Sequence, residues 1–267
     1  PSECRYEVAG RVDQVGAGVE AFVVGDPVIA LTNQGGYGEK MCVPAGQAIR
    51  RPELLPVEQA AGLMVAGFTA YTALVAQARV REGDHVLIHA TAGGVGLMAV
   101  DIARRFGATI YGTASPQKHE FLRARGVEHP IDYHRVDVRR EITRLTGGRG
   151  VDIVLDSIGG DIFQRSLSAA KVYGHVNTLL DPGTDIDWKE ARNRNLSISF
   201  TLMLTPMLMD LAEARRRQNK ILHRCAKLIT DFKLKAVVSD VMPLKDAAIA
   251  HQMIEQGHVQ GKIVLSI

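Results

Sequence analysis

The sequence has few cysteines, few aromatic residues and no long apolar run. Its 267 residues include 3 cysteines, 1 tryptophan and 5% aromatic residues in all. Cys4, Cys42 and Cys225 are odd in number and far apart, which excludes a disulfide framework and favours reduced thiols. No apolar run reaches membrane-spanning length, and the N-terminus lacks the charged-then-apolar pattern of a signal peptide. We therefore expect a cytoplasmic protein with no membrane partner.

The chain also lacks a strong charge of one sign. Its formal net charge is +3, with 23% charged and 46% hydrophobic residues, which is an ordinary composition for a globular protein. This balance does not call for a nucleic-acid partner. The run Arg215-Arg216-Arg217 has a nucleic-acid interpretation, but a solvated helix face beside Glu213 explains it better. The length favours two domains over one.

Residues 85–107 carry the most informative local pattern. Val86-Leu87-Ile88 predicts a buried parallel strand, a glycine-rich turn follows at 91–96, and apolar residues then recur at helical spacing. Glycines let the backbone approach a pyrophosphate, and the helix N-terminus offers it free N–H groups. Thr91 stands where the first glycine is usual, so a turn without a ligand is the alternative. The strand-turn-helix context favours a dinucleotide site formed by Ala92, Gly93, Gly94, Val95 and Gly96.

The pattern on either side of this motif differs. From Glu7 to Ala48, short apolar runs such as Met41-Cys42-Val43 alternate with turn signals, which predicts an antiparallel β region. Residues 54–78 predict a helix broken at Gly67. From His85 onward strands and helices alternate, which predicts a parallel doubly wound α/β sheet. The predicted strands are 86–88, 109–113, 129–131, 153–155, 175–179 and 196–202, and the helices are 94–106, 117–124, 137–145 and 161–170.

The C-terminal part returns to β sequence. Pro206 predicts the start of a long helix that runs toward Ile229, and strand-like residues at 236–238 and 263–265 flank a helix at 245–256. We assign the tail to the first domain, which is therefore discontinuous. The predicted domains are a β-rich substrate domain of residues 1–62 and 232–267, and a dinucleotide-binding domain of residues 63–231.

Residues after the predicted strands indicate the cofactor. NAD-specific domains usually place an acid at the end of the second strand, whereas this strand continues into Ser115. Ser115 can donate to a 2′-phosphate and Lys118 can pair with it, although Lys118 alone also fits a surface lysine. The missing acid predicts NADPH. Asn177 and Thr178 end the fifth strand and face the same crevice, or simply form a turn.

Several segments come in an order typical of one protein superfamily. They are 67–71 (GFTAY), 90–96 (ATAGGVG), 112–115 (GTAS), 150–160 (GVDIVLDSIGG) and 257–265 (GHVQGKIVL). Together they resemble the medium-chain dehydrogenase/reductase superfamily, specifically its zinc-free quinone oxidoreductase (zeta-crystallin-like) branch. The resemblance implies a Rossmann domain with a GroES-like substrate domain, and a homodimer. It also implies a segment before Pro1, which is not a methionine.

The resemblance further implies roles for individual residues. Thr69 corresponds to a residue that approaches the nicotinamide, and Tyr133 to one beside the adenosine phosphate. Zinc-dependent relatives carry Gly-His-Glu where this chain has Arg5-Tyr6-Glu7, and a tyrosine is no ordinary substitute for that histidine ligand. We therefore expect no metal site, and Tyr6 is the one candidate catalytic acid, with a packed tyrosine at a strand end as the alternative.

The implied reaction is hydride transfer from NADPH to a small electrophilic substrate, a quinone or an α,β-unsaturated carbonyl. Two alternatives remain open at this point. One is an enoyl-thioester reductase of the polyketide-synthase type, and the other is a non-catalytic NADPH-binding protein.

Overall fold

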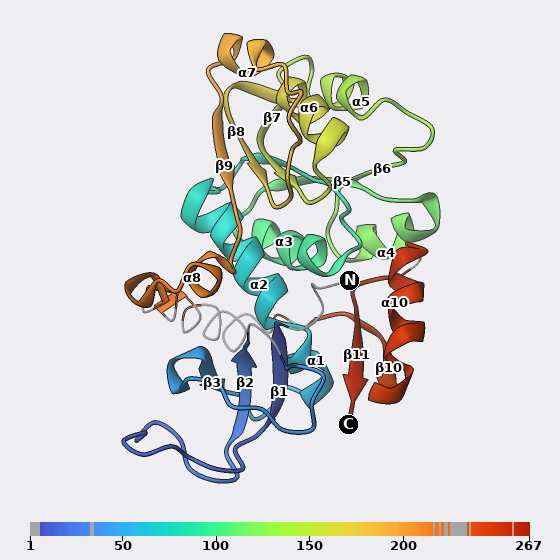
Figure 1. Ribbon diagram of the computed structural model, residues 1–267. Helices are drawn as coiled ribbons and strands as arrows, with labels where there is room; N and C mark the ends of the chain where they lie inside the picture. Colours follow the sequence, from blue (N-terminus) through green and yellow to red (C-terminus); the bar gives the residue numbers. More distant parts are fainter. Residues whose placement is uncertain are drawn as a thin grey trace. The chain divides into compact units, whose positions relative to one another are not determined.

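The computed structural model describes residues 6–32, 35–215, 217–218, 220–221, 224, 234, 236–257 and 259–267. The chain forms two compact units (Figure 1). The terminal unit comprises Pro1–Phe68 and Met203–Ile267, and the sheet unit comprises Thr69–Leu202. These limits are not those of the predicted domains, whose boundaries at 62/63 and 231/232 stay a prediction.

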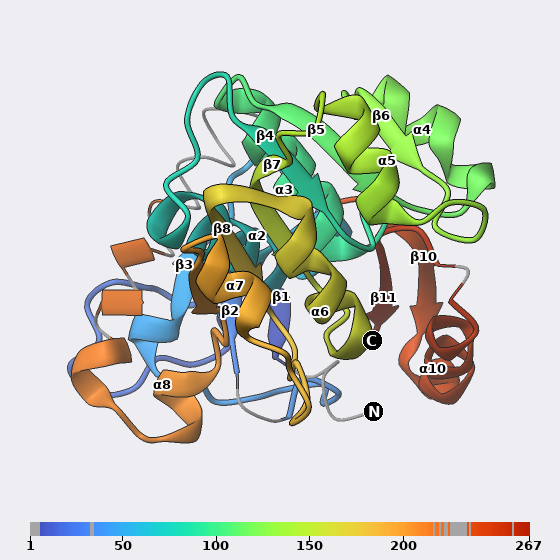
Figure 2. The same cartoon turned by 90° about the horizontal axis from the view of Figure 1, so that it is seen from above.

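The sheet unit contains a 6-stranded sheet with the order β6-β5-β4-β7-β8-β9. Every neighbouring pair is parallel, and Figure 2 shows β6 and β8 toward opposite ends of the sheet. In chain order this is the Rossmann arrangement 3-2-1-4-5-6, so the predicted doubly wound fold is confirmed. The strands are β4 (His85–Ile88), β5 (Thr109–Thr113), β6 (His129–Ile131), β7 (Val151–Asp156), β8 (Ala170–Thr178) and β9 (Ser197–Phe200).

Helices cover both faces of this sheet. Figure 1 shows α3 on one face and α5 and α6 on the other. The core under α5 and α6 includes Leu87, Tyr111 and Val154 from the strands, with Ile142 and Phe163 from the helices. Leu87 lies opposite Tyr111 on one neighbouring strand and opposite Val154 on the other, so the three side chains face the same side of the sheet. The helices are α3 (Gly94–Arg105), α4 (His119–Ala124), α5 (Val138–Leu145), α6 (Gly160–Ala169) and α7 (Lys189–Asn193), with the 3-10 turn η4 (Pro116–Lys118) before α4.

The predicted helical stretch at 54–78 has a break, but not at Gly67. It consists of α1 (Val57–Ala61), α2 (Met64–Tyr71) and a π-helix, η3 (Thr72–Gln77). Gly67 lies inside α2, where its N–H donates to the Leu63 carbonyl at 2.8 Å. The break lies at Gly62 and Leu63.

A distant carboxylate explains the position of this break. Glu7 Oε2 accepts a hydrogen bond from the Val65 N–H at 2.7 Å, and Glu7 Oε1 pairs with Lys262 Nζ at 2.9 Å. An anionic acceptor at the first turn stabilises a helix start. A Cβ on Gly62 would lie 3.3 Å from the Lys262 side chain, so a residue other than glycine there would have to displace that side chain by a few tenths of an ångström.

The terminal unit contains an antiparallel sheet of β1 (Glu7–Arg11), β2 (Pro27–Leu31) and β3 (Ala48–Arg50), preceded at β3 by the 3-10 turn η2 (Ala45–Gln47). The strand-like run at 41–43 is not a strand. The β region instead places β3 at 48–50, because Ile49 pairs with Ile29 of β2 and both are buried.

The C-terminal segments of this unit follow the predicted order. β10 (Val238–Pro243) pairs in parallel with β11 (Lys262–Ser266), and η5 (Leu244–Asp246) and α10 (Ala247–Glu255) lie between them. The predicted helix at Pro206 begins as α8 (Thr205–Leu208) but ends after one turn, and Asp210 has a left-handed φ of 51°. Much of the remainder of that prediction, toward Ile229, lies outside the described residues.

Thr91 and Gly112 give a test of the packing at the carboxyl end of the sheet. Thr91 is fully buried, and a Cβ on Gly112 would lie 2.7 Å from its Oγ1 and 2.9 Å from its Cγ2. We expect Gly112→Ala to lower the free energy of unfolding by about 1–3 kcal/mol through overpacking, measured by urea denaturation. Thr91→Ala removes both clashing atoms, so the double variant should be more stable than the two single effects predict.

Gly10→Ala is the control for this pair, because nothing lies within 4 Å of a Cβ at that position. Strictly additive effects of Thr91→Ala and Gly112→Ala would contradict the proposed clash.

Candidate functional site

The glycine turn between β4 and α3 is built around the carbonyl of Ala90. Ala90 has a φ of 47°, which a residue with a Cβ rarely adopts. Its carbonyl accepts a hydrogen bond from the Gly93 N–H at 2.9 Å. A Cβ on Gly96 would lie 2.6 Å from this carbonyl oxygen and 2.5 Å from that of Thr91. Glycine at position 96 is therefore required by a close backbone approach.

The turn residues predicted from the sequence come together in space. Ala92 and Gly96 are buried, whereas Gly93, Gly94 and Val95 are partly exposed. Gly93 occupies the N-cap of α3 without a side-chain hydrogen bond to the helix. The first N–H groups of a helix have no intrahelical partner, and here no side chain at the cap competes with an anion for them.

Ser115, Lys118 and Tyr133 follow neighbouring strands at the same edge of the sheet. Thr113 of β5 lies opposite Ile131 of β6, so the residues after both strands emerge at the carboxyl edge. Ser115 is the N-cap of η4, and its carbonyl accepts from the Lys118 N–H at 3.0 Å. Partial burial lowers the pKa of Lys118 because desolvation disfavours the ammonium. Tyr133 is 49% exposed.

Asn177 and Thr178 are both buried inside the sheet unit. Asn177 Nδ2 lies 2.5 Å from Gln77 Oε1 and 2.7 Å from Ser199 Oγ. Thr178 Oγ1 lies 3.1 Å from Asp156 Oδ2. Their side chains are thus held by neighbouring elements of the fold. Gln77, which comes from the π-helix, was not predicted from the sequence, because Gln77 and Asn177 are separated by 100 residues.

Asp156 makes contacts of a structural kind. Its Oδ1 accepts hydrogen bonds from the Ile158 N–H at 2.9 Å and the Gly159 N–H at 3.1 Å. These bonds fix the turn between β7 and α6.

Thr69 and Tyr6 fall in different units. Thr69 is buried in α2 at the start of the sheet unit. Tyr6 is partly buried in the terminal unit, and its carbonyl accepts from the Thr32 N–H at 2.9 Å. The catalytic role of Tyr6 and the cofactor contact of Thr69 both stay predictions.

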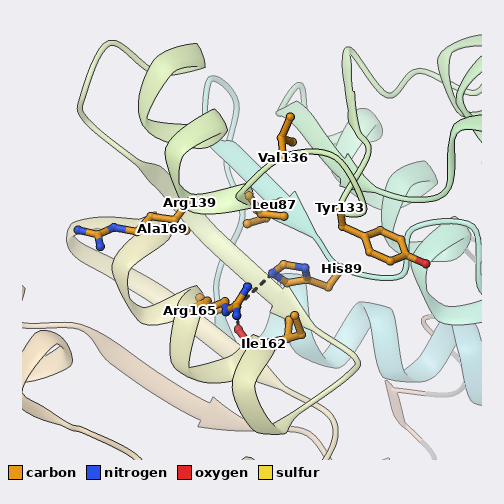
Figure 3. Close-up of a pocket in the computed structure, with 10 residues that line it drawn as sticks. Leu87, His89, Tyr133, Val136, Arg139, Ile162, Arg165 and Ala169 are labelled. Carbon is orange, nitrogen blue, oxygen red and sulfur yellow. Dashed lines mark hydrogen bonds between the residues drawn. The ribbon is translucent and has the colours of Figure 1, made fainter.

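His89, the residue before Ala90, is a buried imidazole that the sequence did not single out. Its Nε2 lies 3.1 Å from Ser166 Oγ and its Nδ1 3.3 Å from Thr113 Oγ1. It lines a cavity of about 70 Å³ together with Tyr133, Ile162 and Ser166 (Figure 3). Burial lowers the pKa of His89 to about 4, a shift that the negative charge of Asp156 partly opposes.

His89 should make stability depend on pH. Its pKa is about 4 in the folded chain, against an ordinary value of 6.5, so below pH 6.5 the unfolded chain binds a proton that the folded chain does not. The stability that neutral His89 provides is therefore complete above pH 6.5 and lost as the pH falls toward 4, by about 3 kcal/mol at most. Urea denaturation at several pH values measures this loss.

His89→Gln should lose less stability than the unchanged chain over this pH range, because glutamine does not titrate. His134→Gln is the control, since His134 is exposed, and it should keep the original slope. An unchanged slope in His89→Gln would show that His89 is not the titrating group.

Among the residues that the structure describes, no three His, Cys, Asp or Glu side chains gather so as to hold a metal ion. None of the helices within the described ranges has the length and apolar character needed to cross a membrane.

Comparisons with known proteins identify the family. Residues 125–265 match the model of the zinc-binding dehydrogenase family. A 2-haloacrylate reductase from Burkholderia sp is 35% identical over 271 residues, which cover 97% of this chain and 79% of that protein.

Solved structures agree with this assignment. The quinone oxidoreductase of Pseudomonas syringae pv. Tomato DC3000 has a TM-score of 0.86 and 30% identity, and the match covers 100% of this chain and 82% of that one. The CurK enoyl reductase also has a TM-score of 0.86 and 30% identity, with 98% and 78% covered. The chain therefore belongs to the zinc-binding dehydrogenase family and, within the medium-chain dehydrogenase/reductase superfamily, to its zinc-free quinone oxidoreductase branch.

Proposed function

We propose that this protein is an NADPH-dependent, zinc-independent reductase that transfers hydride to a quinone or an α,β-unsaturated carbonyl. The observation that carries the proposal is the 35% identity, over 97% of the chain, with an enzyme named for reducing a 2-haloacrylate. A haloacrylate is itself an electron-poor alkene conjugated to a carboxyl group. The similarity to a quinone oxidoreductase supports the other acceptor class.

The glycine turn suits a dinucleotide. A Cβ on Gly96 would meet two backbone carbonyl oxygens, and the uncapped start of α3 presents N–H groups where a pyrophosphate needs donors. Ala92, Gly93, Gly94, Val95 and Gly96 would hold the pyrophosphate. When bound, NADPH supplies the hydride.

Other residues would orient the two ends of the cofactor and complete the reaction. Ser115, Lys118 and Tyr133 would surround the 2′-phosphate, whose negative charge favours the ammonium of partly buried Lys118. Thr69, Asn177 and Thr178 would lie on the nicotinamide side. Tyr6 would donate the proton that completes reduction after hydride reaches the substrate.

Cofactor preference tests the role of Lys118. We expect NADPH to bind at least about tenfold more tightly than NADH, or about 1.4 kcal/mol, measured by titrating the fluorescence of the reduced cofactor. Lys118→Ala should remove most of this preference, because it should lower the affinity for NADPH and leave the affinity for NADH unchanged. Lys189→Ala, at the start of α7, is the matched control and should keep the preference. Equal affinities in the unchanged protein would contradict the assignment of NADPH.

Oxidation of NADPH with a panel of acceptors tests the reaction itself. Turnover of quinones or enones is the expected result. The enoyl-thioester alternative is favoured by the similarity to the CurK enoyl reductase, and turnover of crotonyl thioester alone would support it. Tight NADPH binding without turnover of any acceptor would favour the non-catalytic alternative.

The proposal includes a homodimer in the cytoplasm. Strand β9 is at one end of the sheet order, and Phe200 on it is 57% exposed. An edge strand can pair with the same strand of a second copy. Sedimentation of the purified protein should give the dimer mass, and a monomer at all concentrations would contradict this part. The low cysteine content of the sequence supports the cytoplasmic location.

A further inference from the structure

We propose that Thr113 and His89 are positioning residues that hold strained Ala90 in place, and thereby preset the glycine turn for the pyrophosphate of the cofactor. The inference rests on the proposed function, because it assigns a role in dinucleotide binding. It concerns residues outside the glycine motif: Thr113 ends β5, and His89 follows β4.

Ala90 has a strained backbone conformation. Its left-handed φ of 47° is disfavoured for a residue other than glycine, because the Cβ then crowds the backbone. This conformation directs the Ala90 carbonyl toward Gly93 and Gly96, so the shape of the turn depends on it. Something must hold the residue there. The Ala90 N–H donates to Thr113 Oγ1 at 3.2 Å, and the Thr91 N–H donates to the Thr113 carbonyl at 3.0 Å.

The direction of the hydrogen bonds around His89 follows from counting hydrogens. Ser166 has one hydroxyl hydrogen, which it donates to the Ile162 carbonyl at 2.7 Å. Ser166 Oγ must therefore accept from His89 Nε2, so Nε2 carries the proton of the neutral ring. Nδ1 is then a bare acceptor, and the Thr113 hydroxyl donates to it. The Thr113 oxygen keeps its lone pairs for the Ala90 N–H.

The result is a one-directional chain from Ala90 through Thr113, His89 and Ser166 to the Ile162 carbonyl of α6. His89 Nε2 lies 3.1 Å from Ser166 Oγ, and Figure 3 shows the His89 ring on the same side as Ile162. His89 and Ser166 are buried, at 4% and 1% exposure, so water does not replace these partners readily. This series of hydrogen bonds connects the glycine turn to helix α6. No local sequence pattern indicates these bonds, because those from His89 span 24 and 77 residues.

Cofactor binding to Thr113 variants tests the role. Thr113→Val keeps the shape but removes the acceptor for the Ala90 N–H, and we expect NADPH to bind about tenfold more weakly. Thr113→Ser keeps the hydroxyl and should bind like the unchanged protein. Adenosine 2′-monophosphate, which has no pyrophosphate, should bind equally to all three. Calorimetry measures each affinity without turnover.

A second substitution separates positioning from general damage. Glycine adopts a positive φ readily, so Ala90→Gly should relieve the need for the Thr113 hydroxyl. The double variant Ala90→Gly/Thr113→Val should recover NADPH affinity to within about twofold of Ala90→Gly alone. Failure of this rescue, or equal weakening of adenosine 2′-monophosphate by Thr113→Val, would overturn the inference.

The tautomer of His89 gives a test that needs no cofactor. Nitrogen-15 NMR of the unchanged protein at neutral pH should find His89 protonated at Nε2 and bare at Nδ1, and the opposite tautomer would overturn the hydrogen-bond chain. If the unchanged protein binds no NADPH, the proposed function fails whatever the tautomer. If it binds NADPH and Thr113→Val binds it equally well, this inference alone fails.

Discussion

The hydrogen bonds around the end of β4 are the constraint on which the sheet unit depends. The His89 N–H donates to the Leu155 carbonyl of β7 at 2.9 Å, and the His89 carbonyl accepts from Ser157 Oγ at 3.0 Å. On the other side, the Thr91 N–H reaches the Thr113 carbonyl of β5 at 3.0 Å. The glycine turn is thus tied to the strands on both sides before any ligand binds. A site fixed in this way avoids an ordering cost on binding.

This constraint explains why residues at the turn are small. Because the end of β4 is fixed, the carbonyl oxygens of Ala90 and Thr91 lie too close to position 96 to leave room for a Cβ there. Thr91 can replace the first glycine of the motif because its side chain turns inward, donates to the Ile88 carbonyl at 2.7 Å and packs against Gly112. The departure from the usual motif is therefore compensated on the neighbouring strand, and the start of α3 keeps its glycines.

The terminal unit depends on a similar long-range contact. Glu7 connects β1 to the start of α2 through the Val65 N–H and to β11 through Lys262. Its carboxylate therefore joins segments from both ends of the chain, which makes this unit discontinuous in sequence. Glu7 and Lys262 have side chains only 11% and 28% exposed, so each compensates the partial burial of the other's charge.

The sequence by itself determined the alternating order of strands and helices in the sheet unit and the strand limits of β5 and β6, because apolar periodicity and turn residues act over a few neighbours. It also determined the glycine turn and the family. Only the tertiary structure decided where the first helical stretch breaks, that β3 lies at 48–50, and that Gln77 holds Asn177 and His89 supports the turn. Each of these depends on partners distant in sequence, such as Glu7 with Lys262 at a separation of 255 residues. Local patterns carry no information about such partners, since burial and hydrogen bonding are set by whichever segments the fold brings together.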